Sequence, residues 1–322
     1  MASRSACDHR RIRRSAVPPR RAAVIRVGPA GWSYPDSPGH VYPAGVPARF
    51  DALHFLAAYF DTIEVNSTFY RPQPARTFAS WVKRVSRNVQ FRFTVKLWQR
   101  FTHERAVPWT ADEIRQVSDG LQVLRDAGRL GALLAQFPWS FKPGTASHEV
   151  LDRLAETFRA WPLVVEVRHG GWGHPEELGR FRDLGVGIAN IDQPLIGQSL
   201  TPAAHATSAV GYARFHGRNY EHWFGEQEDA AQRYDYLYSA KELAPWVDRI
   251  RALAGTEGVA DVYVITNNHF EGKGPANALM LRAMLERRKA KAPPVLFATY
   301  RNDLEPWAEP AEEQPADDMR LL

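Results

Sequence analysis

The feature of this sequence that most restricts its fold is a repeated alternation between short apolar runs and stretches with helical apolar spacing. The runs that we expect to be strands are residues 24–27, the start of 62–72, 91–97, 130–137, 163–168, 186–192, 210–216 and 261–267. Between them, apolar side chains recur at the spacing of one buried helix face, as in Phe50, Leu53, Leu56 and Phe60. Eight strands with about seven intervening helices predict an α/β chain that folds as a (β/α)8 TIM-type barrel.

Local signals mark the ends of several expected helices. Thr110 with Glu113 and Ser239 with Glu242 have the spacing of capping boxes. Pro275 is expected as the first residue of the last helix. Residues 193–209 carry no helical stripe, so we expect the barrel to be irregular between its sixth and seventh strands.

The main alternative fold is an open, doubly wound sheet. That fold usually places a glycine-rich phosphate turn after its first strand, and residues 28–31 do not fit the pattern G-x-G-x-x-G. The runs 130–137, 163–168 and 261–267 are nearly continuous in apolar residues, as parallel strands covered on both faces should be. The barrel is therefore the better prediction.

Charge divides the chain into three parts. Residues 1–22 are basic, with seven Arg against one Asp, and residues 302–322 hold seven acidic residues against one Arg. We expect both ends to be disordered tails that flank a single domain at 23–301. The basic tail could bind nucleic acid.

The remaining composition is typical of a soluble protein, with 44% apolar and 24% charged residues. Cys7 is the only cysteine, which excludes an internal disulfide and a thiolate metal cluster. No apolar run reaches the roughly 18 residues of a membrane helix. We therefore expect a cytoplasmic protein without membrane association, and the oligomeric state stays open.

Polar side chains gather where the expected strands end, which is the face that carries the active site in TIM barrels. Several of them stand two residues apart, so that each such pair points to one face of its strand. Charged residues are rarely buried unless they are paired. The polar residues at the strand ends are Glu64, Asn66, Thr94, Lys96, Gln136, Glu166, Arg168, Asn190, Asp192, Arg214, His216, Asn267, Asn268 and His269.

We interpret this cluster as a ligand site, although a structural role is open for each member. Arg168 and Arg214 could simply hold Glu166 and Glu64 as buried ion pairs. For Glu64, the expected partners are Lys96 and Arg214. The predicted catalytic residues are Glu64, Lys96, Glu166, Asp192 and His216. The predicted substrate-binding residues are Asn66, Tyr70, His103, Gln136, Arg168, Arg214, Arg218, Tyr236, Asn267, Asn268 and His269.

A divalent metal is an alternative at the same strand ends. Cations at those ends would repel a divalent ion, and these are Lys96, Arg168 and Arg214. We therefore predict no cofactor and keep a divalent metal as the alternative. The ligands of such a metal would be Glu64, Glu166, Asp192 and His216.

Two further groups have chemistry of their own. Lys96 could form a Schiff base if burial lowered its pKa, but its acidic neighbours should raise that pKa. His103, just past the third strand, could act as a general acid or base. Residues 217–238 hold Arg218, Tyr236 and other aromatics, and would either cover the barrel mouth as a lid or pack on its rim.

A series of short motifs follows the strand ends along the chain: Gly31-Trp-Ser-Tyr34, Glu64-Val-Asn-Ser-Thr-Phe-Tyr70, Phe93-Thr-Val-Lys96, Gln136-Phe-Pro138, Val165-Glu-Val-Arg-His169 with Trp172, Arg214-Phe-His-Gly-Arg218, and Asn267-Asn-His269 with Asn277. From about residue 24 to residue 285, these motifs together resemble the YecE-like family, also called domain-of-unknown-function family 72. The resemblance implies a TIM-type barrel and supplies no reaction. Likeness to endonuclease IV and sugar-isomerase barrels would imply a metal, but this sequence has no histidine-rich set at its strand ends.

The expected function is therefore that of an enzyme acting on a small anionic or polyhydroxylated substrate at the C-terminal ends of the strands. A hydrolase or an isomerase or lyase fits the residue types. The alternatives are a metal-dependent phosphoesterase or endonuclease IV-like hydrolase, and a non-catalytic protein that binds a ligand or nucleic acid.

Overall fold

The computed structural model describes residues 22–47, 49–105, 107–220 and 234–312. The predicted basic tail lies almost wholly outside this part of the chain. Among the described residues, no helix has both the length and the apolar character that a membrane span requires.

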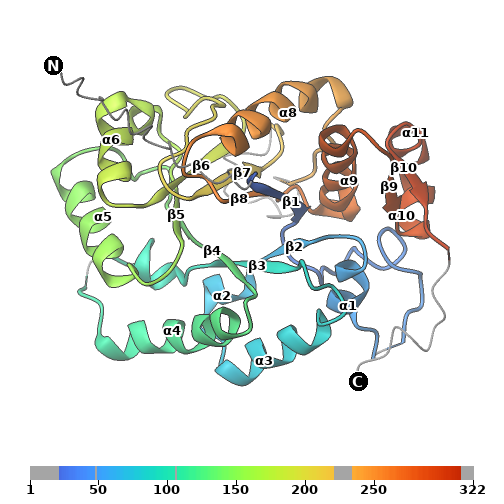
Figure 1. The fold of residues 1–322 in the computed structure, drawn as a ribbon, viewed down its shortest axis with the longest axis horizontal. Coiled ribbons are helices and arrows are strands. Elements are labelled where there is room, and N and C mark those ends of the chain that lie inside the picture. Colours follow the sequence, from blue (N-terminus) through green and yellow to red (C-terminus); the bar gives the residue numbers. More distant parts are fainter. Residues whose placement is uncertain (1–21, 48, 106, 221–233, 313–322) are drawn as a thin grey trace, which may run out of the picture.

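Eight parallel strands form the barrel, in the spatial order β1-β8-β7-β6-β5-β4-β3-β2 (Figure 1). The chain order of strands and the spatial order are the same around the ring, as in a TIM barrel. The fold prediction is therefore confirmed. The strands are β1 (Val24–Pro29), β2 (Thr62–Val65), β3 (Arg92–Lys96), β4 (Leu130–Gln136), β5 (Leu163–Glu166), β6 (Gly187–Asp192), β7 (Val210–Phe215) and β8 (Asp261–Thr266).

Helices surround the barrel and connect its strands (Figure 1). Both capping boxes are present, at Thr110 and at Ser239. The last barrel helix begins at Lys273, so the prediction that Pro275 opens it was wrong by two residues. The main helices are α1 (Ala52–Ala57), α3 (Ala75–Arg84), α4 (Ala111–Asp126), α5 (Thr145–Thr157), α6 (Pro175–Asp183), α8 (Ala240–Gly255) and α9 (Lys273–Glu286). The shorter ones are α2 (Ser67–Tyr70), α10 (Pro294–Thr299) and α11 (Arg301–Leu304).

The barrel closes between β1 and β2 by an unusually short seam. β1 pairs with β8 along its whole length, but its link to β2 is a single bridge between Ala30 and Glu64. The Gly31 amide donates to the Glu64 carbonyl at 2.8 Å beside this bridge. Gly28 permits the approach, because a Cβ there would lie 1.8 Å from the carbonyl oxygen of Thr62.

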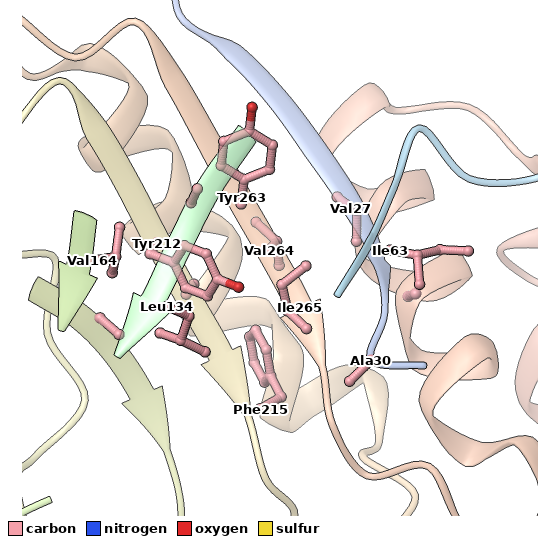
Figure 2. Packing of buried hydrophobic residues seen from close by; sticks show 14 of the residues in the cluster. Val27, Ala30, Ile63, Leu134, Val164, Tyr212, Phe215, Tyr263, Val264 and Ile265 are labelled. Carbon is pink, nitrogen blue, oxygen red and sulfur yellow. The ribbon is translucent and has the colours of Figure 1, made fainter. Parts of the chain in front are cut away.

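Aromatic rings fill the lower interior of the barrel, below the polar strand ends. Figure 2 shows Tyr212 and Tyr263 with Leu134 and Val164 between the strands. The two tyrosine rings lie 6.3 Å apart. Gly131 leaves room for Tyr263, since a Cβ would lie 2.6 Å from that ring. Because this interior is packed, the polar side chains can meet only beyond it, at the C-terminal ends of the strands.

The irregularity expected between the sixth and seventh strands is present, because residues 193–209 form no helix. The predicted start of the acidic tail at residue 302 was wrong. Arg301–Leu304 is helical as α11, and β10 (Ala308–Pro310) pairs with β9 (Ala290–Ala292) in a small parallel sheet. Leu304 and Ala308 are buried there, so apolar residues within the acidic stretch anchor it. Residues 313–322 lie outside the described chain.

Candidate functional site

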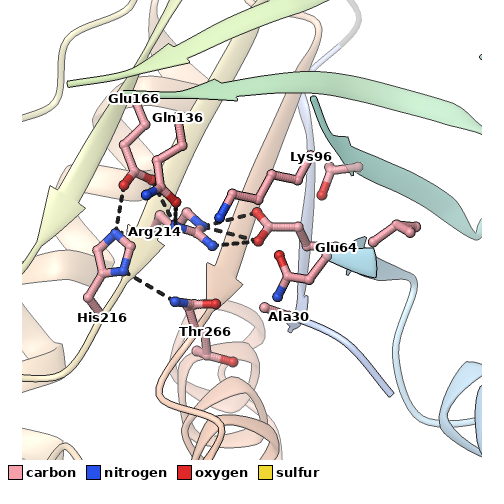
Figure 3. A network of polar contacts seen from close by, with 12 residues as sticks. Ala30, Glu64, Lys96, Gln136, Glu166, Arg214, His216 and Thr266 are labelled. Carbon is pink, nitrogen blue, oxygen red and sulfur yellow. Dashed lines mark hydrogen bonds and ion pairs between the residues drawn. The ribbon is translucent and has the colours of Figure 1, made fainter. Parts of the chain in front are cut away.

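Arg214, at the end of β7, stands at the centre of a buried polar network in the barrel mouth (Figure 3). Its Nη2 donates to Glu64 at 2.7 Å and its Nε to both Glu64 oxygens at 3.0 and 3.2 Å. Its Nη1 donates to Glu166 at 3.0 Å and to Gln136 at 3.1 Å. One guanidinium therefore joins three strand ends, and the expected Glu64–Arg214 pair is confirmed.

Electrostatics keep this network charged although it is buried. Burial opposes the charge on Arg214, but Glu64 and Glu166 outweigh burial and raise its pKa. Burial also opposes the Glu166 carboxylate, yet His216, through its hydrogen bond, and Arg214, through its charge, hold the pKa of Glu166 well below its usual range. A buried ion pair of this kind is stable only when every charge has a partner.

His216 extends the network on the side of Glu166. Its Nε2 lies 3.0 Å from Glu166 Oε1, and its Nδ1 lies 3.3 Å from the amide nitrogen of Asn267. Burial lowers the pKa of His216 to about 3, so the ring is neutral. The partners require Nε2 to donate and Nδ1 to accept. Asn267 therefore orients the His216 ring, and His216 in turn orients Glu166.

Tyr212 is a member that the sequence analysis missed. Its hydroxyl lies 2.8 Å from Glu64 Oε2 and 3.0 Å from Thr94 Oγ1. Tyr212 stands two residues before Arg214, so strand alternation could have identified it. With Arg214 and Tyr212 both donating, each Glu64 oxygen has a hydrogen-bond donor. Glu64 is thus an anchored carboxylate.

Lys96 differs from the other charged residues of the mouth. Among the described residues its Nζ has no hydrogen bond or ion pair, so the expected pairing with Glu64 was wrong: Arg214 and Tyr212 already occupy that carboxylate. Its Nζ lies 4.0 Å from the centre of the Phe69 ring. Burial, followed by Arg214, lowers the pKa of Lys96 to about 7 against the opposing effect of Glu64. Glu64 and Glu166 do raise this pKa, as expected, but burial and Arg214 outweigh them.

Arg168 and His103 lie beside Lys96 on the rim. Arg168 donates to Glu166 at 3.2 Å and to Gln193 at 3.3 Å. The His103 ring packs edge-on against Phe69, the ring that Lys96 also contacts. Burial, then Lys96, lowers the pKa of His103 to about 4, so its imidazole is neutral.

Asp192 and Arg218 form a second cluster beside the network. Arg218 binds both Asp192 oxygens, at 2.8 and 2.7 Å. Tyr238 and Trp246 each donate to the same carboxylate at 2.7 Å. Four donors leave Asp192 little capacity for proton transfer, so its geometry is that of an anchor for the loop after β7. Residues 221–233 of the predicted lid lie outside the described chain.

Two side-chain amides that follow β2 and β8 have unused acceptors. Asn66 donates weakly to the Tyr34 hydroxyl at 3.5 Å, and Asn268 donates to the Tyr236 carbonyl at 2.7 Å. The Oδ1 atoms of Asn66 and Asn268 are buried without a hydrogen-bond partner among the described residues.

The remaining predicted binding residues lie around these amides. The His269 ring stacks on Tyr34 with centres 4.0 Å apart. Tyr236 directs its hydroxyl to Glu242. Tyr70 is 71% exposed on the rim, where no described contact ties it to the polar network.

The metal alternative needs a cluster of ligands. In the part of the chain that the structure describes, no group of three or more His, Cys, Asp or Glu side chains is placed to hold a metal ion. The acidic candidates Glu64, Glu166 and Asp192 are engaged by arginines instead.

The fold and these contacts define a TIM-barrel protein with a charged, buried site at the C-terminal ends of its strands. Residues 26–299 match the family described as "Protein of unknown function DUF72". The chain belongs to this family, and the resemblance inferred from the sequence motifs is confirmed.

Relatives of this chain agree with that assignment. A DUF72 family protein from Thermotoga maritima MSB8 has a TM-score of 0.70 and 31% identity, over 82% of this chain and 99% of that one. A DUF72 family protein from Enterococcus faecalis V583 matches in fold, with a TM-score of 0.69, 23% identity and coverage of 82% and 96%. The UPF0759 protein YunF of Bacillus subtilis is 27% identical over 82% of this chain and 95% of its own length.

Proposed function

We propose that this protein is an enzyme that acts on a small anionic or polyhydroxylated substrate in the barrel mouth. The observation that carries the proposal is the uncompensated amine of Lys96 beside a network whose other charges are paired. Sites of this kind, with converging polar groups and a perturbed pKa at the C-terminal face, are typical of TIM-barrel enzymes.

The charges of the mouth favour an anion. Glu64 and Glu166 are matched by Arg214 and Arg168, which contact them directly. Lys96 adds a positive charge that no described carboxylate within 4 Å neutralises when the amine is protonated. A bound carboxylate or phosphate would supply the missing partner, and it would raise the pKa of Lys96.

The open acceptors favour hydroxyl groups on the same ligand. Asn66 and Asn268 each leave a buried Oδ1 atom without a donor among the described residues. A buried acceptor without a hydrogen bond costs about 1–3 kcal/mol, and a substrate hydroxyl could recover that energy. An oxyacid or a sugar phosphate combines both features.

The test is ligand-dependent thermal unfolding of the full chain. The probes are pyruvate, lactate, glyceraldehyde 3-phosphate and glucose 6-phosphate, with glucose as the neutral comparison. A ligand at many times its dissociation constant should raise the melting temperature by several degrees. We expect that shift with an anionic probe in the wild type and in Lys83→Met, a control at an exposed lysine, and its loss in Lys96→Met.

Four results would count against the proposal. An absence of any shift across the probes would remove the anion site, and an undiminished shift in Lys96→Met would remove Lys96 from it. Recovery of the bound probe chemically unchanged after long incubation, for every probe that binds, would favour the non-catalytic binding protein. Activity that appears only after addition of Mn²⁺ or Zn²⁺ would favour the metal-dependent hydrolase.

A further inference from the structure

We propose that Lys96 is a Schiff-base nucleophile, and that the substrate of this site is a small anion bearing an aldehyde or ketone carbonyl. The inference deepens the proposed function and rests on it, because it names the substrate class of the same site. It is drawn from where Lys96 lies, from what surrounds it and from which neighbours are already engaged.

The position of Lys96 suits a nucleophile. It is the last residue of β3, and Figure 3 shows its side chain reaching from that strand toward the Glu64–Arg214 pair. The carboxylates that could have held its amine are occupied: Glu64 by Arg214, and Glu166 by Arg214 and Arg168. The lysine nitrogen therefore keeps its lone pair or its proton available for a ligand.

The surroundings of Lys96 favour the neutral amine that such a reaction needs. Its Nζ lies on the Phe69 ring, and burial lowers its pKa to about 7. The charged groups that face it come from the ends of three strands, β2, β5 and β7: Arg214 and Arg168 lower its pKa, and Glu64 and Glu166 raise it. Near neutral pH, the neutral and therefore nucleophilic form of the amine is accessible.

The chemical step balances without a co-reactant. The Lys96 nitrogen forms a bond to the carbonyl carbon, and the π electrons of the carbonyl move to its oxygen, which takes a proton. The nitrogen loses a proton to solvent. A further proton from solvent adds to the hydroxyl group, the carbon–oxygen bond breaks so that water leaves, and the nitrogen lone pair forms the double bond of an iminium ion. Its positive charge is next to the carboxylate or phosphate of the substrate, which stabilises it.

The competing explanation is that Lys96 only packs on Phe69 as a cation–π contact. Such contacts contribute about 0.5–2 kcal/mol, and they require no reaction with a carbonyl. The two explanations differ in covalent chemistry, which reduction by borohydride detects.

The experiment treats the full chain with sodium borohydride in the presence of pyruvate, glyoxylate or dihydroxyacetone phosphate, and locates adducts by peptide mass spectrometry. We expect one predominant adduct, on the peptide that contains Lys96. With pyruvate, the peptide should gain the mass of pyruvate less one oxygen atom. The trapping rate should rise with pH and level off above about 7, as the amine loses its proton.

Matched variants separate charge from nucleophilicity. Lys96→Arg keeps a positive charge but cannot form the imine, so it should retain the melting-temperature shift with anions and lose the adduct. Lys83→Met should retain both.

Two outcomes would overturn the inference. One is a melting-temperature shift with anions that is lost in Lys96→Met, while borohydride traps no carbonyl probe on Lys96. Lys96 would then belong to an anion site but would not form a Schiff base. The other is labelling of Lys96 at the same rate as exposed lysines such as Lys83, because a reactive amine in a site should be labelled faster than surface amines. If no anion binds at all, the failure lies in the proposed function itself.

Discussion

Replacing Lys96 by methionine should make the protein more stable, and the gain should depend on pH. The pKa of Lys96 falls from 10.5 to about 7 on folding, with burial as the main cause. The folded state therefore disfavours the charged amine, whereas methionine keeps most of the apolar stem and removes the charge. The residue that we place at the centre of the chemistry thus costs stability.

The size of the gain follows from that pKa. Each tenfold change in proton affinity corresponds to about 1.4 kcal/mol, so the unscreened penalty is on the order of 5 kcal/mol. Solvent reaches part of the side chain and screens it, and we expect about 3 kcal/mol. Below pH 7 both states carry the proton and the penalty is complete. Between pH 7 and 10.5 the folded state releases its proton first, so the penalty shrinks as pH rises.

Urea unfolding at pH 6 and pH 9, followed by the fluorescence of the ten tryptophans, measures this difference. The advantage of Lys96→Met over wild type should be about 2 kcal/mol smaller at pH 9 than at pH 6. The surface control Lys83→Met should show no such dependence. Equal advantages at the two pH values, or a variant less stable than wild type at pH 6, would refute the reasoning.

Two further substitutions test the seam and the network. Gly28→Ala should destabilise the barrel by about 3 kcal/mol or prevent folding, because its Cβ would lie 1.8 Å from the Thr62 carbonyl oxygen. Thermal unfolding followed by circular dichroism measures this loss. The control Gly179→Ala, with no atom near its Cβ, should unfold at or above the wild-type temperature. Arg214→Met should lower the free energy of unfolding in urea by about 3–5 kcal/mol, because it leaves two buried carboxylates without their arginine partner. Adding Glu64→Gln to Arg214→Met should restore part of that loss, and strict additivity of the two changes would contradict the network.

The fold was predictable because the barrel repeats one pattern many times. Strand and helix alternation located all eight strands to within a few residues, and the side-chain chemistry of Thr110 and Ser239 marked two helix starts. The prediction failed at residues 302–310, where charge composition pointed to disorder. Leu304 and Ala308 are buried there, and Ala308 lies in a strand that pairs with Ala290–Ala292, a partner outside any short sequence window around it.

The sequence predicted which residues lie in the candidate site better than it predicted which of them form ion pairs with one another. Alternation along each strand places Glu64, Glu166 and Arg214 at one mouth, and these do meet. The state of Lys96 depends on which carboxylates other groups have already engaged, and that is a property of three-dimensional packing. Strand alternation could also have predicted Tyr212, because Tyr212 and His216 each lie two residues from Arg214 along the chain.

The seam of the barrel has a consequence for how the molecule opens. The Glu64 backbone carries the single bridge to β1, while the Glu64 side chain holds Arg214. The Gly31 amide at this bridge should therefore be among the first barrel amides to exchange with deuterated solvent. A ligand that tightens the Glu64–Arg214 pair should slow that exchange, so occupancy of the mouth could be followed from a backbone amide that need not touch the ligand.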